Sequence, residues 1–389
     1  MYDVMVSGAG PAGSYAAYGC AKRGLKVLLL DKGAPGRRKC CAGGLLGRTT
    51  KALDFRLPDD IIESRVRGFS FVAEGVRYSF PFGEELATVV RREALDAYLV
   101  GKAKEIGVEV LEDAKVMSGS EDGAKVMVIT TKGRFDARFL VIAEGAAGPL
   151  ADSFCGKNQQ GRAAMGCAVE VKLNQAPRDE IDLHLSSYSR SLRPPRSFPL
   201  TGAVFPLRGS VMVSFVDRKE PRTSYERVMN DAFEVLEGEY GGLRVLGKPC
   251  YHPLPIAPRS RLHSRRALVI GDAAGLVSPF SGEGLTSAFL SAKAAAEVLV
   301  EAHAQAKPRL DRYDSLCAKY LLHRLRAAGM LGPFMHYMVN VIGHQRLFSN
   351  LKEDDELINS CAAFARGEME IPDFALKAVP RLPGLFLGH

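Results

Sequence analysis

Two adjacent cysteines, Cys40 and Cys41, stand in a basic loop and could do acid–base chemistry. An unperturbed thiol, with a pKa of about 8.5, is still protonated at neutral pH and can donate a proton to a reacting group. Gly43 and Gly44 follow, which indicates that the backbone here runs close to something flat or bulky. Spacing alone leaves two interpretations of Cys41 open: a proton donor, or a small packing residue, the commoner role.

A second candidate for chemistry is the glycine-rich motif GAGPAG at residues 8–13. Gly8 permits a tight turn, Gly10 lets the backbone approach a pyrophosphate, and Gly13 allows a helix and a strand to pack closely. The free N–H groups at the start of that helix can bind phosphates. Asp31 stands eighteen positions after Gly13, where its carboxylate can accept hydrogen bonds from ribose hydroxyls. The pattern predicts a dinucleotide site, and Asp31 suits a free 2′-hydroxyl, as in FAD or NAD.

The segments around this motif supply the elements that must position it. Residues 2–7 form an apolar run typical of a buried parallel strand. Residues 14–23 predict a helix, which Gly24 ends, and residues 25–30 predict a second strand. Together they make one βαβ unit, the context that the motif requires.

Two later segments also place an acidic residue beside a glycine after a predicted strand. The strand at 139–143 runs into Glu144-Gly145, and the strand at 267–270 runs into Gly271-Asp272. Asp272 can accept a hydrogen bond from a ribityl hydroxyl. The first motif alone fits an NAD dehydrogenase equally well, but a nicotinamide-only enzyme needs no second site of this kind. Two cofactor-contacting segments about 260 residues apart indicate a long, bent dinucleotide, FAD.

These motifs resemble those of a known superfamily. GAGPAG with Asp31, Arg92 in RREALD, the Glu144-Gly145 pair and GDAAGLVSPFSGEG look like the FAD-dependent p-hydroxybenzoate hydroxylase-like superfamily. Within it, Cys41 in CCAGGLL and the stretch GEGLTSAFLSAKAAAE are most similar to the geranylgeranyl reductase family. The resemblance covers residues 1 to 305.

The resemblance implies an FAD-dependent reductase that saturates isolated C=C bonds in isoprenoid chains of lipids or quinones. It places Cys41 at the isoalloxazine ring, which reverses the interpretation favoured by spacing. The implied reaction is hydride transfer from reduced flavin to one alkene carbon, with a proton from Cys41 or an ordered water to the other. The expected cofactor-binding residues are Gly8, Gly10, Ala12, Gly13, Asp31, Lys32, Cys41, Ala42, Gly43, Arg92, Glu144, Gly145, Gly271, Asp272, Pro279, Gly282 and Gly284.

The sequence departs from the family in the segment that lines the lipid cavity. Family members carry Tyr-x-Trp-x-Phe-Pro there, whereas this chain has no tryptophan and has Thr201 and Ala203 before Phe205-Pro206. Phe205 and Pro206 are the expected substrate-binding residues, in a cavity whose wall must differ. Glu144 also replaces the usual aspartate, a milder change. The substrate could therefore be bulkier than geranylgeranyl, or not a prenyl chain.

Two other functions stay open from the sequence. One is a flavin monooxygenase of an aromatic or polyketide substrate, and the other is a non-catalytic flavoprotein that passes electrons to a membrane partner. For the reductase, the expected partners are a prenylated lipid or quinone and an electron donor such as NADPH or a ferredoxin. Arg92 could reach a phosphate or the ribityl chain, or be a surface arginine.

Composition limits the remaining possibilities. The 389 residues are 47% hydrophobic, and the net charge of +8 with a pI near 9.0 is mild and spread along the chain. No basic run is interleaved with aromatics, so nucleic acid is not an expected partner. The eight cysteines include no CxxC pair and none at zinc-ligand spacing, which favours a reducing compartment and no metal. No apolar stretch is long enough to span a bilayer, so we expect a cytoplasmic protein, with any membrane contact peripheral.

The expected fold class is α/β: a Rossmann-type FAD-binding domain, an interleaved antiparallel-sheet substrate domain, and a helical C-terminal region. The substrate sheet starts with a predicted hairpin at 68–82. A helix is predicted from Val89 to Glu105, and a basic surface loop at 190–196. The predicted boundaries are 1–67, 83–160 and 250–305 for the FAD-binding domain, 68–82 and 161–249 for the substrate domain, and 306–389 for the C-terminal region.

Overall fold

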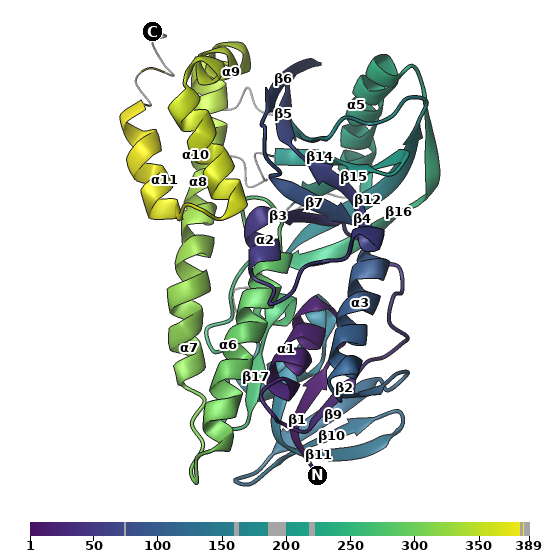
Figure 1. Ribbon diagram of the computed structural model, residues 1–389, viewed down its shortest axis with the longest axis vertical. Helices are drawn as coiled ribbons and strands as arrows, with labels where there is room; N and C mark the ends of the chain where they lie inside the picture. The colour runs from purple at the N-terminus through teal and green to yellow at the C-terminus, as the bar shows by residue number, and fades with distance from the viewer. Residues whose placement is uncertain (74, 159–162, 186–199, 218–221, 382–383, 385–389) are drawn as a thin grey trace.

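The computed structural model describes residues 1–73, 75–158, 163–185, 200–217, 222–381 and 384. A mainly parallel sheet and a mainly antiparallel sheet occupy opposite halves of the long axis, and C-terminal helices run along one side of both (Figure 1). This arrangement confirms the predicted α/β fold class. The basic loop predicted at 190–196 lies outside the described residues.

The first sheet builds on the predicted βαβ unit. Strand β1 (Tyr2–Ser7) pairs in parallel with β2 (Val27–Leu30) and with β11 (Gly133–Ile142), and β11 pairs in parallel with β17 (Ala267–Val269). Its strands are fully buried where they meet, as their continuous apolar sequences predict. The remaining strands are β8 (Glu109–Leu111), beside β2, and β9 (Val116–Glu121) and β10 (Val126–Thr130), which form an antiparallel extension of β11.

Three helices cover this sheet, and one of them follows the glycine motif. Helix α1 (Pro11–Ala21) packs against α3 (Arg92–Glu105) and α6 (Leu285–His303). Helix α1 begins at Pro11 rather than at Ser14, because proline has no N–H to lose and its fixed φ suits the first helical position. The helix predicted from Val89 is also wrong at its start. Val89 and Val90 belong to strand β7 (Ala87–Val90), where β-branched side chains pack well, and α3 follows.

The second sheet has the strand order β16-β12-β15-β14-β13-β5-β6. Helix α5 (Arg222–Tyr240) packs on β12 and β15 through Ala232 and Leu236. A small sheet of β3, β7 and β4 packs against β13 and β14 through buried Val66 and Val89. The bounds are β3 (Gly44–Leu46), β4 (Ile62–Val66), β5 (Gly68–Ala73), β6 (Val76–Pro81), β12 (Ala163–Leu173), β13 (Glu180–Leu185), β14 (Leu200–Leu207), β15 (Ser210–Asp217) and β16 (Leu243–Pro255).

From Arg312 onward, the described part of the chain forms helices joined by short turns. Phe348 stacks on Phe71 at 4.5 Å between ring centroids, which joins these helices to the hairpin of β5 and β6. The elements are α7 (Arg312–Cys317), a π-helical turn η4 (Ala318–Leu322), α8 (His323–Ile342), α9 (His344–Glu353), α10 (Asp355–Arg366), α11 (Ile371–Ala378) and η5 (Val379–Arg381). The short elements elsewhere are α2 (Gly47–Lys51), η1 (Asp59–Ile61), η2 (Gly145–Ala147), α4 (Leu150–Cys155) and η3 (Gly271–Ala274).

Candidate functional site

The glycine motif forms a turn that tolerates no side chain at two of its three glycines. Gly8 has φ +104°, and a Cβ there would lie 2.3 Å from the carbonyl oxygen of Ala143. A Cβ on Gly13 would lie 1.8 Å from the carbonyl oxygen of Gly8. Gly10 differs, because nothing lies within 4 Å of the position its Cβ would take. The turn is therefore tightly packed at Gly8 and Gly13 and has open space at Gly10.

Asp31 holds this turn from the end of β2. Its Oδ2 accepts a hydrogen bond from the N–H of Ala9 at 2.7 Å, and its Oδ1 accepts one from the N–H of Gly33 at 3.0 Å. Arg37 pairs with the same Oδ1 at 2.5 Å. The carboxylate is almost completely buried, so its charge is satisfied by these three groups. Asp31 thus positions the glycine turn as well as standing where the ribose is expected.

The second and third predicted motifs meet the first in space. A Cβ on Gly271 would lie 3.0 Å from the Cβ of Ala12, so η3 lies against the start of α1. Glu144 follows β11 and accepts a hydrogen bond from the hydroxyl of Ser7, at the end of β1, at 2.6 Å. Its other oxygen accepts from the N–H of Leu150 at 3.1 Å. Glu144 therefore ties two strand ends to the start of α4.

Burial raises the pKa of Glu144, although the hydrogen bonds from Ser7 and Leu150 oppose the shift. A carboxyl whose pKa is higher in the folded protein contributes stability that is complete below its unfolded pKa and is lost as pH rises through the folded value. We expect the free energy of unfolding of wild type, minus that of Glu144→Gln, to fall as pH increases from 4 toward 7. Urea unfolding at several pH values measures it. A difference that does not change with pH would contradict the prediction.

Basic side chains lie near Asp272. The Nε2 of His252, on β16, lies 4.0 Å from an oxygen of Asp272. Burial lowers the pKa of His252, and Lys39, Arg92 and Lys32 lower it further, whereas Asp272 raises it. Burial raises the pKa of Asp272, against the effect of His252 and Arg92. Positive charge from Lys32, Lys39 and Arg92 therefore gathers around His252 and Asp272, as an anionic cofactor requires.

This charge distribution predicts that His252 takes up a proton when FAD binds. An anion bound among these groups offsets the repulsion from the neighbouring cations, so we expect FAD to raise the pKa of His252. Because the bound pKa is then the higher one, FAD affinity increases as pH falls through the range between the free and bound values. NMR titration of the histidine, with and without FAD, measures the shift. His252→Gln is the control and should bind FAD without that pH dependence; an unchanged pKa would contradict the prediction.

Arg92, at the first position of α3, is not a free surface arginine. Its guanidinium makes two hydrogen bonds to Asp96 at 2.9 and 3.1 Å, one helical turn away. Burial alone would lower the pKa of Arg92, but the Asp96 carboxylate and the Cys41 thiol raise it. Asp96 therefore fixes the guanidinium beside Cys41, within electrostatic reach of Asp272.

Cys41 lies where the predicted close approach of the backbone occurs. Its Sγ accepts a hydrogen bond from the N–H of Gly43 at 3.4 Å. Gly43 has φ +78°, and a Cβ there would lie 1.8 Å from the carbonyl oxygen of Val90. A Cβ on Gly44 would lie 2.4 Å from the ring of Phe205. The flat group that Gly44 accommodates is thus Phe205, which belongs to the predicted cavity strand.

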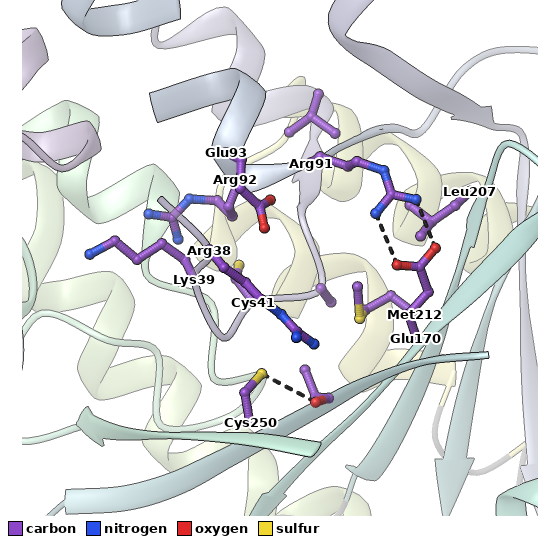
Figure 2. A pocket seen from close by; sticks show the side chains of 13 residues that line it. Arg38, Lys39, Cys41, Arg91, Arg92, Glu93, Glu170, Leu207, Met212 and Cys250 are labelled. Atoms are coloured by element: carbon purple, nitrogen blue, oxygen red, sulfur yellow. Dashed lines mark hydrogen bonds and ion pairs between the residues drawn. The ribbon is translucent and has the colours of Figure 1, made fainter. Parts of the chain in front are cut away.

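A pocket opens beside Cys41 between the loop and the second sheet (Figure 2). In the figure, Arg91 points to Glu170, with which it makes two hydrogen bonds of 3.0 and 2.7 Å. Arg38, Lys39 and Arg92 lie at one side of the pocket, and Leu207 and Met212 lie at the other side beside the Arg91–Glu170 ion pair (Figure 2). Its lining residues are Arg38, Lys39, Cys41, Ala42, Val90, Arg91, Arg92, Glu93, Ala168, Glu170, Leu207, Met212 and Cys250.

The predicted substrate residues do not line this pocket. Phe205 packs on Gly44, and the buried Pro206 uses its carbonyl oxygen to accept a hydrogen bond from Ser64 at 2.7 Å. Leu207 and Met212 contribute to the wall instead. Side chains alternate between the two faces of a strand, so neighbouring residues of β14 have different surroundings.

The segment 278–284 lies between Asp272 and the second sheet. A Cβ on Gly284 would lie 3.0 Å from an oxygen of Asp272, and one on Gly282 would lie 3.0 Å from Val216. Glu283, which the sequence interpretation did not single out, accepts a hydrogen bond from Thr49 at 3.2 Å and one from the N–H of Thr286 at 3.1 Å. Pro279 lies near Gly329 of α8.

Several other residues of the cleft also escaped the sequence interpretation: Arg37, Lys39, His252 and Cys250. Arg37 and Lys39 belong to the basic loop, so their charge was a usable signal. His252 and Cys250 were missed because β16 was not predicted. Three prolines (Pro249, Pro253 and Pro255) argue against a strand there, yet β16 is at the edge of its sheet, where proline is tolerated.

The residues present fit FAD. Helix α1 has no side-chain cap, and its first internal hydrogen bond is from Ser14 to Gly10, so the N–H groups of Ala12 and Gly13 are available to phosphates. The open space at Gly10 and the cations around Asp272 suit a pyrophosphate and the rest of a dinucleotide.

Comparison with known proteins gives the family. Residues 1–325 match the FAD binding domain family. Menaquinone reductase of Mycobacterium tuberculosis is 29% identical over 316 residues, 76% of each chain. Digeranylgeranylglycerophospholipid reductase 1 of Methanopyrus kandleri is 28% identical over 315 residues, 77% of this chain and 81% of the relative.

Solved structures share the fold. A geranylgeranyl bacteriochlorophyll reductase-like protein from Thermoplasma acidophilum has a TM-score of 0.77 at 18% identity, covering 97% of this chain and 98% of that one. The halogenase PltM has a TM-score of 0.72 at 17% identity, covering 98% and 84%. The resemblance to geranylgeranyl reductases is therefore confirmed, while the fold is common to several flavin chemistries. The chain belongs to the FAD binding domain family, and it is an FAD-dependent oxidoreductase.

Proposed function

We propose that this protein saturates C=C double bonds of isoprenoid chains, of the geranylgeranyl type, on a lipid or quinone. The observation that carries the proposal is the pocket whose lining combines the Cys41 thiol with the apolar side chains of Val90, Leu207 and Met212. An isolated alkene accepts hydride poorly, so its reduction needs a dry site that holds the chain in place. The names of the relatives, which include a menaquinone and a digeranylgeranyl lipid reductase, support the same substrate class.

In this proposal, bound FAD supplies the hydride. Cys41 holds a proton at Sγ for the second alkene carbon. The N–H of Gly43 donates to that sulfur and Arg92 lies beside it, so the sulfur is oriented while its own proton stays available. Leu207 and Met212 hold the apolar chain and exclude water.

The partners belong to the same proposal. Reducing equivalents come from a donor such as NADPH or a ferredoxin. None of the helices in the described part of the chain has the length and apolar character to cross a bilayer. Contact with the lipid is proposed to be peripheral, for which α8, α11 and η5 offer exposed apolar side chains: Met330, Phe334, Leu376 and Val379.

The test is anaerobic turnover followed by mass spectrometry. FAD-loaded protein, reduced with dithionite, is incubated separately with geranylgeranyl diphosphate, with menaquinone and with an unsaturated ether phospholipid. We expect one of these products to gain two hydrogens for each double bond reduced. Reoxidation of the flavin without any lipid product would contradict the proposal.

Two control incubations separate the alternatives. A monooxygenase would consume NADPH and oxygen and add one oxygen atom to an aromatic substrate. The halogenase shares this fold, so the fold by itself does not separate the alternatives. A non-catalytic electron carrier would be reoxidised by a membrane fraction and would modify neither substrate.

A further inference from the structure

Two cysteines that are far apart in the chain meet beneath the pocket. Cys40, in the loop before β3, donates a hydrogen bond from its Sγ to the carbonyl oxygen of Cys250 at 2.9 Å. The two residues are 210 positions apart. Cys250, on β16, donates from its Sγ to the carbonyl oxygen of Ala168 on β12 at 3.2 Å (Figure 2). The pair therefore connects the loop that carries Cys41 to the second sheet.

The surroundings distinguish the roles of the two thiols. Cys250 lines the pocket and is only partly buried, so a small reagent can reach it. The neighbouring thiol of Cys40 lowers the pKa of Cys250 to about 7, and the charge of Arg38 at the pocket wall lowers it further. The same contact, with burial, raises the pKa of Cys40. A partly exposed thiol of lowered pKa next to a second thiol is the arrangement of redox-reactive cysteine pairs.

We propose that Cys250 and Cys40 form a peroxide-reactive pair, in which Cys250 is oxidised first and Cys40 resolves it to a disulfide. The Cys250 thiolate attacks one oxygen of hydrogen peroxide, and with one proton taken up this gives Cys250 sulfenic acid and water. Cys40 then attacks the sulfenic sulfur, its proton leaves with the hydroxyl as a second water, and an S–S bond forms. Two thiols are oxidised by two electrons, and one peroxide is reduced to two waters.

The oxidant is a product that this class of enzyme can generate beside the pair. Reduced flavin that meets oxygen instead of substrate yields hydrogen peroxide, so the pair is placed to react with a by-product of its own site. The inference depends on the FAD-dependent family and not on alkene reduction. The Sγ of Cys40 lies 2.9 Å from the carbonyl oxygen of Cys250, so the two residues are in direct contact, and an S–S bond requires that their sulfur atoms approach to about 2.05 Å.

The test uses the FAD-loaded protein with hydrogen peroxide in small molar excess. We expect the number of thiols titrated by Ellman's reagent to fall by two from the eight of the reduced protein. Digestion without reductant should yield one cross-linked pair of peptides that contain Cys40 and Cys250, and dithiothreitol should separate them. No loss of thiols, or a disulfide that involves Cys41 instead, would overturn the proposal.

Three variants make the test specific. Cys250→Ser should lose no thiols, whereas Cys40→Ser should stop at the sulfenic acid, which dimedone labels. Cys167→Ser is the matched control, because Cys167 is buried on β12 next to the pair and should leave the cross-link intact. The flavin absorbance spectrum and a thermal melt show that each variant is folded. A Cys40→Ser variant that carries no dimedone adduct at Cys250 would also overturn the assignment.

Discussion

Replacing Gly13 with alanine is expected to destabilise the protein and to abolish FAD binding. The new Cβ would stand 1.8 Å from the carbonyl oxygen of Gly8 and 3.0 Å from the Cβ of Ala143. The carbonyl group of Gly8 cannot move away without opening the turn that Asp31 holds. We expect the free energy of unfolding to fall by about 3 kcal/mol, the upper end for an overpacked interior. Urea unfolding of the apo protein measures the loss.

Gly10→Val is the matched variant, because it tests FAD affinity without a change in the stability of the apo protein. Gly10 has φ −75° and ψ −178°, which any residue adopts, and its Cβ position is open. We expect the apo protein to unfold within about 0.5 kcal/mol of wild type. FAD affinity should nevertheless fall about 100-fold, the equivalent of roughly 2.8 kcal/mol, because the side chain fills the space proposed for the pyrophosphate. Wild-type affinity would show that the phosphates do not pass over Gly10.

Replacing Cys41 with serine is the second change with a large expected effect. A serine hydroxyl is a far weaker acid than a thiol, so we expect the turnover of a prenyl substrate to fall about 100-fold, the lower end for loss of a general acid. FAD affinity should stay close to wild type, since Gly43 and Arg92 keep their positions. Single-turnover reduction of the substrate by the photoreduced enzyme measures the chemical step apart from the electron donor.

A matched cysteine variant distinguishes a proton donor from a packing residue. Cys155, at the end of α4, is buried and does not line the pocket. Cys155→Ser should therefore show wild-type turnover under the same conditions. If Cys41→Ser also turns over at the wild-type rate, Cys41 is a packing residue and an ordered water supplies the proton.

The cofactor and the elements around the glycine motif could be predicted because their determinants are close in sequence. The strand, the glycine motif, the helix and Asp31 lie within the first 31 residues, and each constrains its neighbours through local backbone geometry. Arg92 and Asp96 are likewise one helical turn apart, a spacing that already predicts their ion pair. The partners of Asp31 were less predictable. The spacing placed it at the ribose, while the structure shows that it also holds the N–H of Ala9.

The substrate half could not be predicted in the same way. Its pocket joins the loop at 38–42, the start of α3, and strands β12 and β16, which are separated by long stretches of chain. These segments are brought together by the pairing of strands, which no local sequence pattern predicts. The prediction is hardest for β16, because its three prolines argue against a strand. The aromatic position that the family resemblance assigned to the cavity, Phe205, instead covers Gly44.

The sequence by itself determined the cofactor and the class of fold, because phosphate binding needs a short run of glycines and a helix start that are contiguous in the chain. It also supplied Cys41 as a candidate acid. Only the tertiary structure decided what surrounds that thiol: Arg92 beside it, an apolar wall from β14 and β15, and Cys250 facing Cys40 from β16. The physical reason is that reactivity and substrate fit depend on charges and surfaces within a few ångströms, which long-range packing brings together.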